Sequence, residues 1–241
     1  MTPPLAATLE DVMKHWKTLK VTLQAAIYAM ALAAGATLLA AEPPVGDGGE
    51  PTIAEVKAAT ARFRDVKVAL AEGYIRDPFN ICETADMMGR AASVGAMGVH
   101  YFRPDLLGVT EPPNPRVTGT GTHTDFRRPA VLLYEPQADG SMTLVGVENL
   151  VFAAAWKAAG HQAPPSFQGV PYDTMIDDPS TPLDEAHNFA PHFDRHVWIY
   201  RDNPNGLFTP FNPAVSCAHH TGGAHEHPTA APGTAPTPAP T

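Results

Sequence analysis

The amino-acid sequence predicts an α+β fold, with one long helix and short helices on an antiparallel sheet of about four strands, joined by long proline-rich loops. Three observations lead to this prediction. A stripe of apolar residues with helical spacing lies near the start of the chain, and several short apolar runs bounded by turn residues follow it. The 26 prolines and 19 glycines are concentrated between those runs, where they indicate loops.

The long helix is predicted to begin at Thr52 and to end before Gly73. Thr52 and Glu55 have the spacing of a capping box, in which the two side chains satisfy free backbone amides at the start of a helix. The apolar residues that follow recur every three or four positions and define one face: Ile53, Val56, Ala59, Phe63, Val66 and Leu70. Gly73 is a typical residue for the carboxyl end of a helix.

The strands are predicted from short apolar or β-branched runs. Asp139-Gly140 favours a tight turn between two of them, which therefore form a β-hairpin. The expected strands are Val99–Phe102, Ala130–Glu135, Met142–Val151 and Arg195–Arg201, the expected short helices are Glu83–Ala92 and Phe152–Ala159, and the expected long loops are Glu111–Gly121 and Gln162–Ala190.

The amino-terminal residues 1–41 are predicted to be an export signal or a membrane anchor. Three lysines precede an uncharged, largely apolar run over residues 21–41, which is the order of charge and apolarity found in export signals. The run is also just long enough to span a bilayer, so a membrane tether through residues 21–41 stays open, as does a buried core helix. We expect a periplasmic or secreted protein in which residues 42–51 are a linker and residues 52–217 form a single domain.

Residues 218–241 are predicted to be a disordered tail rich in His, Pro, Ala and Thr. The tail has almost no large apolar residues, so it cannot bury enough surface to offset the entropy of ordering. Histidines in flexible segments bind transition metals weakly and without fixed geometry, and we expect this of His219, His220, His225 and His227.

The chain contains two cysteines, Cys82 and Cys217. In an oxidising compartment, two cysteines far apart in sequence usually form a disulfide, which here would tie the start of the domain to its end. The alternative is that both thiolates are metal ligands, but neither cysteine has the CxxC or CxxH spacing of such sites.

The charge and the motifs exclude several classes of protein. The formal net charge is −9 and the longest basic run is Arg127-Arg128, so no nucleic-acid partner is expected. The sequence also lacks a glycine-rich phosphate loop, a GxSxG nucleophile elbow and an HExxH zinc motif.

Histidines and glutamates on the predicted strands form the main candidate for chemistry, a transition-metal site. His192 and His196 enter one strand and His100 lies on another, while Glu135 and Glu148 stand within or at the end of apolar runs, where a carboxylate needs a partner. Such nitrogen and oxygen donors suit Zn²⁺, Cu²⁺ or Fe²⁺. His100 and His196 can share an ion only if they project from the same sheet face and stand within about 8 Å of each other.

Each candidate ligand also has a structural interpretation. A single strand histidine can be a hydrogen-bonded core residue, Glu135 can be an exposed turn residue, and Glu148 can pair with an arginine. Met87, Met88 and Met97 are better explained as core filling than as copper ligands.

The sequence therefore supports three hypotheses. The first is an extracytoplasmic protein that binds or traffics a transition metal. The second is a metal-dependent enzyme of hydrolase or oxygenase type with an open coordination position, in which a carboxylate such as Glu148 or Asp194 near the ion serves as base. The third is a structural or small-ligand-binding domain without metal, whose pocket is formed by aromatic side chains: Tyr101, Tyr134, Trp198, Tyr200 and Phe208.

Several strings of the sequence also suggest a family. They are Met97-Gly-Val-His-Tyr101, Leu132-Leu-Tyr-Glu-Pro136 with Leu144-Val-Gly-Val-Glu148, His192-Phe-Asp-Arg-His-Val-Trp198, and Asn203-Pro-Asn-Gly-Leu-Phe208 followed by Asn212-Pro-Ala-Val-Ser-Cys217. The region from about residue 54 to residue 217 resembles an uncharacterised family of secreted or periplasmic bacterial proteins with MGxHY, LLYEP, HxxxHVW and NPxVSC strings. The resemblance implies a secreted, disulfide-linked domain and no particular activity.

Overall fold

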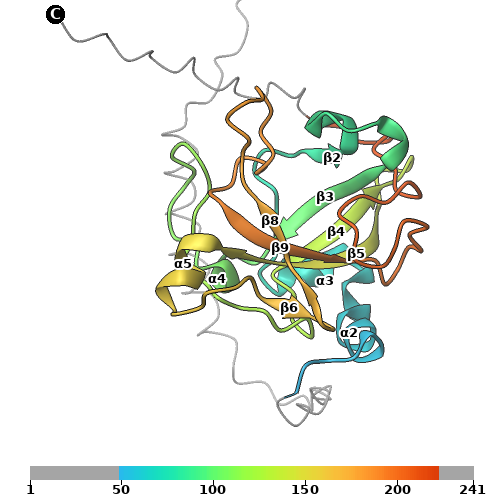
Figure 1. The fold of residues 1–241 in the computed structure, drawn as a ribbon. Coiled ribbons are helices and arrows are strands. Elements are labelled where there is room, and N and C mark those ends of the chain that lie inside the picture. Colours follow the sequence, from blue (N-terminus) through green and yellow to red (C-terminus); the bar gives the residue numbers. More distant parts are fainter. Residues whose placement is uncertain (1–48, 223–241) are drawn as a thin grey trace, which may run out of the picture. The chain divides into compact units, whose positions relative to one another are not determined.

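An antiparallel sheet of seven strands organises the fold in the computed structural model, which describes residues 49–222 (Figure 1). The strands follow one another across the sheet in the order β1, β3, β4, β5, β9, β8, and β2 pairs with the same edge of β3 as β1 does. Their bounds are β1 Ile75–Arg76, β2 Cys82–Thr84, β3 Ala96–Phe102, β4 Val131–Pro136, β5 Met142–Phe152, β8 Asp173–Met175 and β9 His192–Val197. A separate two-stranded sheet pairs β6 (Ser166–Phe167) with β7 (Val170–Pro171).

The helices are short. They are α2 Ile53–Thr60, α3 Val66–Ala71, α4 Pro104–Leu107 and α5 Ala153–Ala158, with single 3₁₀ turns η1 Ala61–Arg64, η2 Ala85–Met88 and η3 Ala92–Val94. Helices and a mainly antiparallel sheet confirm the α+β class, but the sheet has more strands than the four expected. The additional strands have only two or three residues, too few for an alternating pattern to be visible in the sequence.

The predicted long helix is interrupted. Its start is confirmed, because Thr52 Oγ1 accepts the Glu55 backbone amide and Glu55 accepts the Thr52 amide. At Asp65, however, the backbone becomes extended, and the Asp65 side chain caps a second helix by accepting the Lys67 amide. An aspartate side chain that bonds its own backbone competes with a continuous helix, which explains the break.

The β4–β5 hairpin and α5 lie where the sequence predicts them. The last long strand does not. We expected it over Arg195–Arg201 because of Pro191 and the β-branched and aromatic run after His196, but β9 begins at His192 and ends at Val197. Trp198 then leaves the ladder, and its backbone amide donates to Leu207 O. His192 is thus a strand residue rather than part of the preceding loop.

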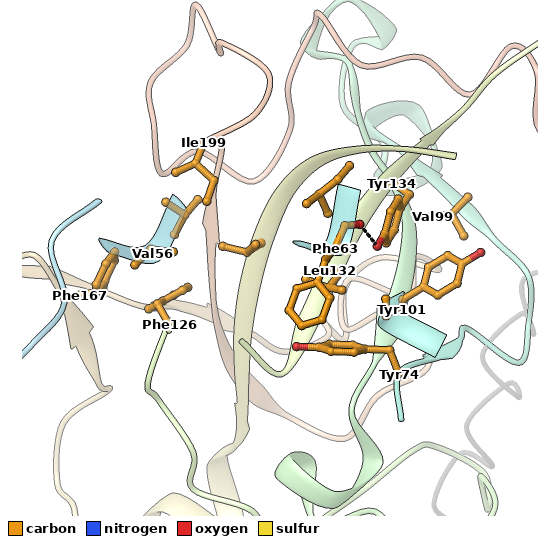
Figure 2. Packing of buried hydrophobic residues seen from close by; sticks show 14 of the residues in the cluster. Val56, Phe63, Tyr74, Val99, Tyr101, Phe126, Leu132, Tyr134, Phe167 and Ile199 are labelled. Carbon is orange, nitrogen blue, oxygen red and sulfur yellow. Dashed lines mark hydrogen bonds between the residues drawn. The ribbon is translucent and has the colours of Figure 1, made fainter. Parts of the chain in front are cut away.

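One face of the sheet, here called the helix-covered face, packs against α2, η1 and α3 (Figure 2). Alternate strand residues such as Val99, Leu132 and Val197 contact buried helix residues such as Val56 and Phe63. The Tyr134 hydroxyl donates to Phe63 O over 2.6 Å, which satisfies a backbone acceptor of the 3₁₀ turn in the core.

The other face, here called the site face, carries a second apolar cluster that includes Phe102, Val131, Leu150 and Phe152. Because strand residues alternate between faces, the register that buries Val147 and Val151 on the helix-covered face directs Glu148 to the site face. Polar residues within this apolar layer form the site described below.

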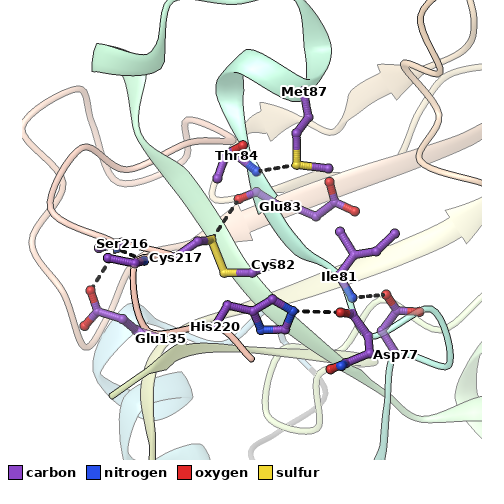
Figure 3. Close-up of a disulfide and its surroundings, with 12 residues drawn as sticks. Asp77, Ile81, Cys82, Glu83, Thr84, Met87, Glu135, Ser216, Cys217 and His220 are labelled. Carbon is purple, nitrogen blue, oxygen red and sulfur yellow. Dashed lines mark hydrogen bonds between the residues drawn. A yellow bond between two sulfur atoms is a disulfide. The ribbon is translucent and has the colours of Figure 1, made fainter. Parts of the chain in front are cut away.

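Cys82 and Cys217 form a disulfide with 5.8 Å between their Cα atoms, so the predicted link is confirmed (Figure 3). Within residues 49–222 no helix has the length and apolarity needed to cross a bilayer. The predicted signal or anchor of residues 1–41 lies outside the described residues, as does most of the predicted linker and of the tail.

Candidate metal centre

Three strands bring His100, Glu148 and His196 together on the site face. His196 on β9 is directly opposite Glu148 on β5 in the antiparallel register. His100 stands on β3, which is separated from β5 by β4, and there the apolar residues Leu133 and Val131 occupy the same face. The two histidines therefore approach the glutamate from opposite sides, and the glutamate lies between them.

The distances fit ligands of a single ion. His100 Nε2 lies 3.4 Å and His196 Nε2 3.5 Å from Glu148 Oε2. One candidate ligand atom from each residue lies within 4.8 Å of the others. Because bonds from Zn²⁺ to nitrogen or oxygen are about 2 Å, ligand atoms around one ion stand roughly 3–4 Å apart. The two imidazole centroids are 6.3 Å apart on the same face, so the condition set from the sequence is met.

The three side chains are buried, and two of them, Glu148 and His196, have polar atoms without a hydrogen-bond partner in the described range of residues. His196 is 1 % and Glu148 3 % exposed. Among the described residues, neither ring nitrogen of His196 has a hydrogen-bond partner, and neither has Glu148 Oε2. Leaving a buried polar group unsatisfied costs about 1–3 kcal/mol, and more for a charged group. A cation bound between them would satisfy these atoms at once.

Electrostatics keeps the glutamate charged. Burial opposes ionisation of Glu148, but His196, His100 and His192 together hold its pKa below the ordinary value. Burial likewise acts to lower the pKa of His100, but the Glu148, Glu83 and Asp77 carboxylates outweigh it and raise that pKa. Burial lowers the pKa of His196. An ionised carboxylate beside a neutral imidazole is the protonation state that binds a metal ion.

His192 is the first residue of β9, four positions before His196. It lies on the site face as well and lines the same cavity. Its Nδ1 is 3.0 Å from Ala190 O, and because a carbonyl only accepts, this nitrogen carries the proton. Burial lowers its pKa to about 4, so the imidazole is neutral near pH 7 with its lone pair on Nε2. A backbone carbonyl that fixes the tautomer in this way is typical of metal-binding histidines. His192 is nevertheless outside the three-residue group whose atoms lie within 4.8 Å of one another.

A small cavity adjoins the group and contains carboxylates that the sequence did not single out as ligands: Asp77, Glu83 and Asp194. Burial raises the pKa of Asp194 well above the ordinary value and that of Glu83 to about 7. Asp194, considered from the sequence as a possible base, reaches the cavity because it alternates with His192 and His196 along β9. Nothing in the sequence indicated Asp77 and Glu83, because the short β1–β2 segment brings them to the cavity.

Glu135 does not join the group. It lies at the end of β4, where it pairs with Arg201 and accepts the Ser216 amide. Met97, considered as core filling, lines the cavity while it is fully buried. Of the tail histidines, His220 Nε2 lies 2.8 Å from Asn80 O and His219 is exposed, whereas His225 and His227 lie outside the described residues.

Comparisons of the chain with family models, with curated proteins and with solved structures found no match.

Proposed function

We propose that this protein binds a transition-metal ion outside the cytoplasm through His100, Glu148 and His196. The observation that carries the proposal is a buried histidine, His196, whose ring nitrogens have no hydrogen-bond partner in the described part of the chain and which has an ionised glutamate 3.5 Å away. Two imidazoles and one carboxylate suit Zn²⁺, Cu²⁺ or Fe²⁺. Binding or trafficking of the ion is the simplest function that such a site performs.

The extracytoplasmic location is supported by independent features. The Cys82–Cys217 disulfide is of a kind that persists in oxidising compartments. The apolar run of residues 21–41 behind three lysines is an export pattern. The resemblance to secreted bacterial proteins implies the same compartment.

A metal-dependent enzyme is the second candidate, and the cavity favours it. Three protein ligands leave a coordination position open, and the cavity beside them has an interior of about 20 Å³, which is enough for one water molecule. A bound ion would supply Lewis acidity to a molecule in that position. Asp194 and His192 would then orient what binds there, because both line the cavity.

The aromatic-pocket hypothesis receives less support. Tyr101 and Tyr134 belong to the core of the helix-covered face, where their rings pack together with centroids 4.8 Å apart. Neither these two residues nor Trp198, Tyr200 or Phe208 line the cavity.

Metal analysis of the full chain tests the proposal. The purified protein, stripped with a chelator and titrated with Zn²⁺, Cu²⁺ and Fe²⁺ in separate experiments, should bind one ion per chain with at least micromolar affinity. Because neither ring nitrogen of His196 has a hydrogen-bond partner within residues 49–222, this histidine is free to bind an ion, and His196→Ala should abolish that stoichiometric binding. No saturable binding by any of the three ions would refute the proposal.

Two controls separate this site from the other histidines. Replacing His219, His225 and His227 together by serine removes tail donors and should leave the one-ion binding unchanged. His123→Ala removes a histidine whose Nε2 donates to the backbone oxygens of Asp125 and Arg128, away from the cavity, and should also have no effect. If the tail variant loses the binding instead, the domain site is not the binding site.

A further inference from the structure

One wall of the cavity is the segment from Asp77 to Glu83, which includes the start of β2. Every second residue of this segment lines the cavity: Asp77, Phe79, Ile81 and Glu83. Two of these side chains are the buried carboxylates that raise the pKa of His100. The wall therefore contributes both the shape of the cavity and part of the charge around the candidate ligands.

Two intervening residues of the same segment, Asn80 and Cys82, bond to the chain that follows β9. Cys82 forms the disulfide with Cys217, whose Sγ lies 3.9 Å from Glu83 O (Figure 3). Asn80 O accepts a hydrogen bond from His220 Nε2 over 2.8 Å. The chain from Cys217 to His220 thus contacts the wall at two points, one a covalent bond and the other a hydrogen bond.

Few other contacts hold the wall. β2 pairs with β3 through three residues only, and its register shifts between Glu83 and Thr84. Before Cys82, the next backbone hydrogen bond to β3 is at Asp77, whose amide donates to His100 O over 2.9 Å, and the Asp77 side chain accepts the Phe79 and Ile81 amides. The disulfide is the one covalent restraint on this segment within the described chain.

We propose that the Cys82–Cys217 disulfide controls how fast the ion is released: a dithiol reductant that opens it frees the wall and lets the metal leave. The proposal rests on the proposed metal-binding function and deepens it, because it assigns a trigger for handing the ion over. The reaction partner is defined by its chemistry, a pair of neighbouring thiols such as those of a thiol–disulfide oxidoreductase.

The reaction is a two-electron thiol–disulfide exchange that begins at Cys217. Cys82 is buried, whereas Cys217 is partly exposed, so a thiolate of the partner attacks Cys217 Sγ. The S–S bond breaks, a mixed disulfide forms on Cys217, and Cys82 leaves as a thiolate that takes up a proton. The second thiolate of the partner then displaces Cys217, which is protonated in turn, and the partner leaves as a disulfide after giving up two electrons.

The release rate of Zn²⁺ to an excess of a chromogenic chelator tests the proposal. The comparison is between the full chain and its Cys82→Ser/Cys217→Ser variant, which needs no thiol reagent that could itself bind zinc. We expect release from the variant to be at least about tenfold faster, while circular dichroism shows that it remains folded. Equal rates, within twofold, in a folded variant would overturn the proposal.

The release rate of a second variant and a check of metal binding complete the test. His220→Ala removes only the hydrogen bond to Asn80 O, and it should accelerate release by a smaller factor in a protein that keeps its disulfide. If the double variant does not fold, an unchanged rate in this variant overturns the proposal by itself. If none of the proteins binds Zn²⁺, Cu²⁺ or Fe²⁺, the metal-binding function fails instead, so the two failures are distinguishable.

Discussion

Glu148 is the residue that both histidines of the candidate metal site contact. It is the only carboxylate of the three-residue group, and both Nε2 atoms approach the same oxygen, Glu148 Oε2. Its negative charge also accounts, together with Glu83 and Asp77, for the raised pKa of His100. Ion binding and imidazole protonation are therefore competing ways of neutralising one buried charge.

Glu148→Gln should weaken metal binding by a factor of about 100 or more, because a neutral amide replaces the anionic ligand while the shape is kept. The measurement is the dissociation constant for Zn²⁺ from competition with a chelator. Glu135→Gln is the matched control, since Glu135 contacts Arg201 and Ser216 and not the histidines. Similar losses in both variants would mean that binding does not occur at Glu148.

His192 makes the metal-free protein sensitive to acid. Its folded pKa is about 4 because of burial, compared with about 6.5 in an unfolded chain. Below pH 6.5 the unfolded state therefore takes up a proton that the folded state does not, so this residue makes stability fall as the pH falls from 6.5 to 4. At pH 7 and above, both states are neutral and the contribution vanishes.

His192→Gln should remove that part of the pH dependence, which is about 3 kcal/mol over the whole interval. Urea unfolding of the chelator-treated protein and the variant at pH 7, 6, 5 and 4 measures it. The difference in unfolding free energy between the two proteins should shift steadily in favour of the variant as the pH decreases. A difference that does not change with pH would contradict the neutral, buried state of His192.

At the scale of the elements, the position of His100 depends on a bulge at Gly98. The β2–β3 register shifts beside it, and Gly98 has a φ of +93°. A Cβ atom at this position would lie 2.5 Å from Tyr134 O on the neighbouring strand. Only glycine therefore allows β3 to approach β4 closely here, two residues before the histidine.

Gly98→Ala should destabilise the protein by more than 3 kcal/mol, because it combines a left-handed backbone with a clash against a central strand. Gly140→Ala is the matched control: it has a φ of +81° but no atom within 4 Å of the added Cβ. It should cost about 1 kcal/mol, from the backbone alone. The measurement is chemical denaturation of both variants, and equal losses would show that the close approach to Tyr134 does not matter.

Some helices, strands and site residues could be predicted from the sequence, and others could not. A continuous apolar pattern specified the β4–β5 hairpin, and the capping box specified the start of α2. The sequence indicates His100 and His196 as imidazoles on predicted strands, and Glu148 as a carboxylate within an apolar run. Their convergence across β4 could not be read from the sequence, since the order of the strands in a sheet depends on long-range pairing.

The features that could not be predicted from the sequence are the helix break at Asp65 and the cavity residues Asp77 and Glu83. All of them depend on interactions that leave no periodic pattern. The side chain of Asp65 caps α3 and breaks the predicted helix, a local competition that apolar spacing does not report. Asp77 and Glu83 reach the cavity from a segment with little regular structure, whose path is set by the disulfide and by hydrogen bonds. Sites formed by irregular segments leave no periodic signal.

For the whole molecule, the disulfide links the first edge of the sheet to the end of the described chain. The sequence separation between Cys82 and Cys217 is 135 residues, and this loop contains most of the strands, including those of all three candidate ligands. A cross-link that closes so long a loop mainly restricts the unfolded chain. Global stability and the site should therefore both depend on it, the first through the unfolded state and the second through the wall of the cavity.

The Cys82→Ser/Cys217→Ser variant of the metal-free protein should lose about 4–5 kcal/mol of unfolding free energy, as the chain-entropy relation gives for a loop of more than 100 residues. Zn²⁺ at about 100 times its dissociation constant should restore roughly 2.7 kcal/mol, since it binds only the folded state. Adding His196→Ala to the variant should remove this restoration, because the metal-free and Zn²⁺-containing samples then unfold with the same free energy. Urea unfolding with and without Zn²⁺ measures all three quantities. A restoration that persists without His196 would place the bound ion elsewhere in the chain, and a loss below 1 kcal/mol would mean that the unfolded chain is already compact without its cross-link.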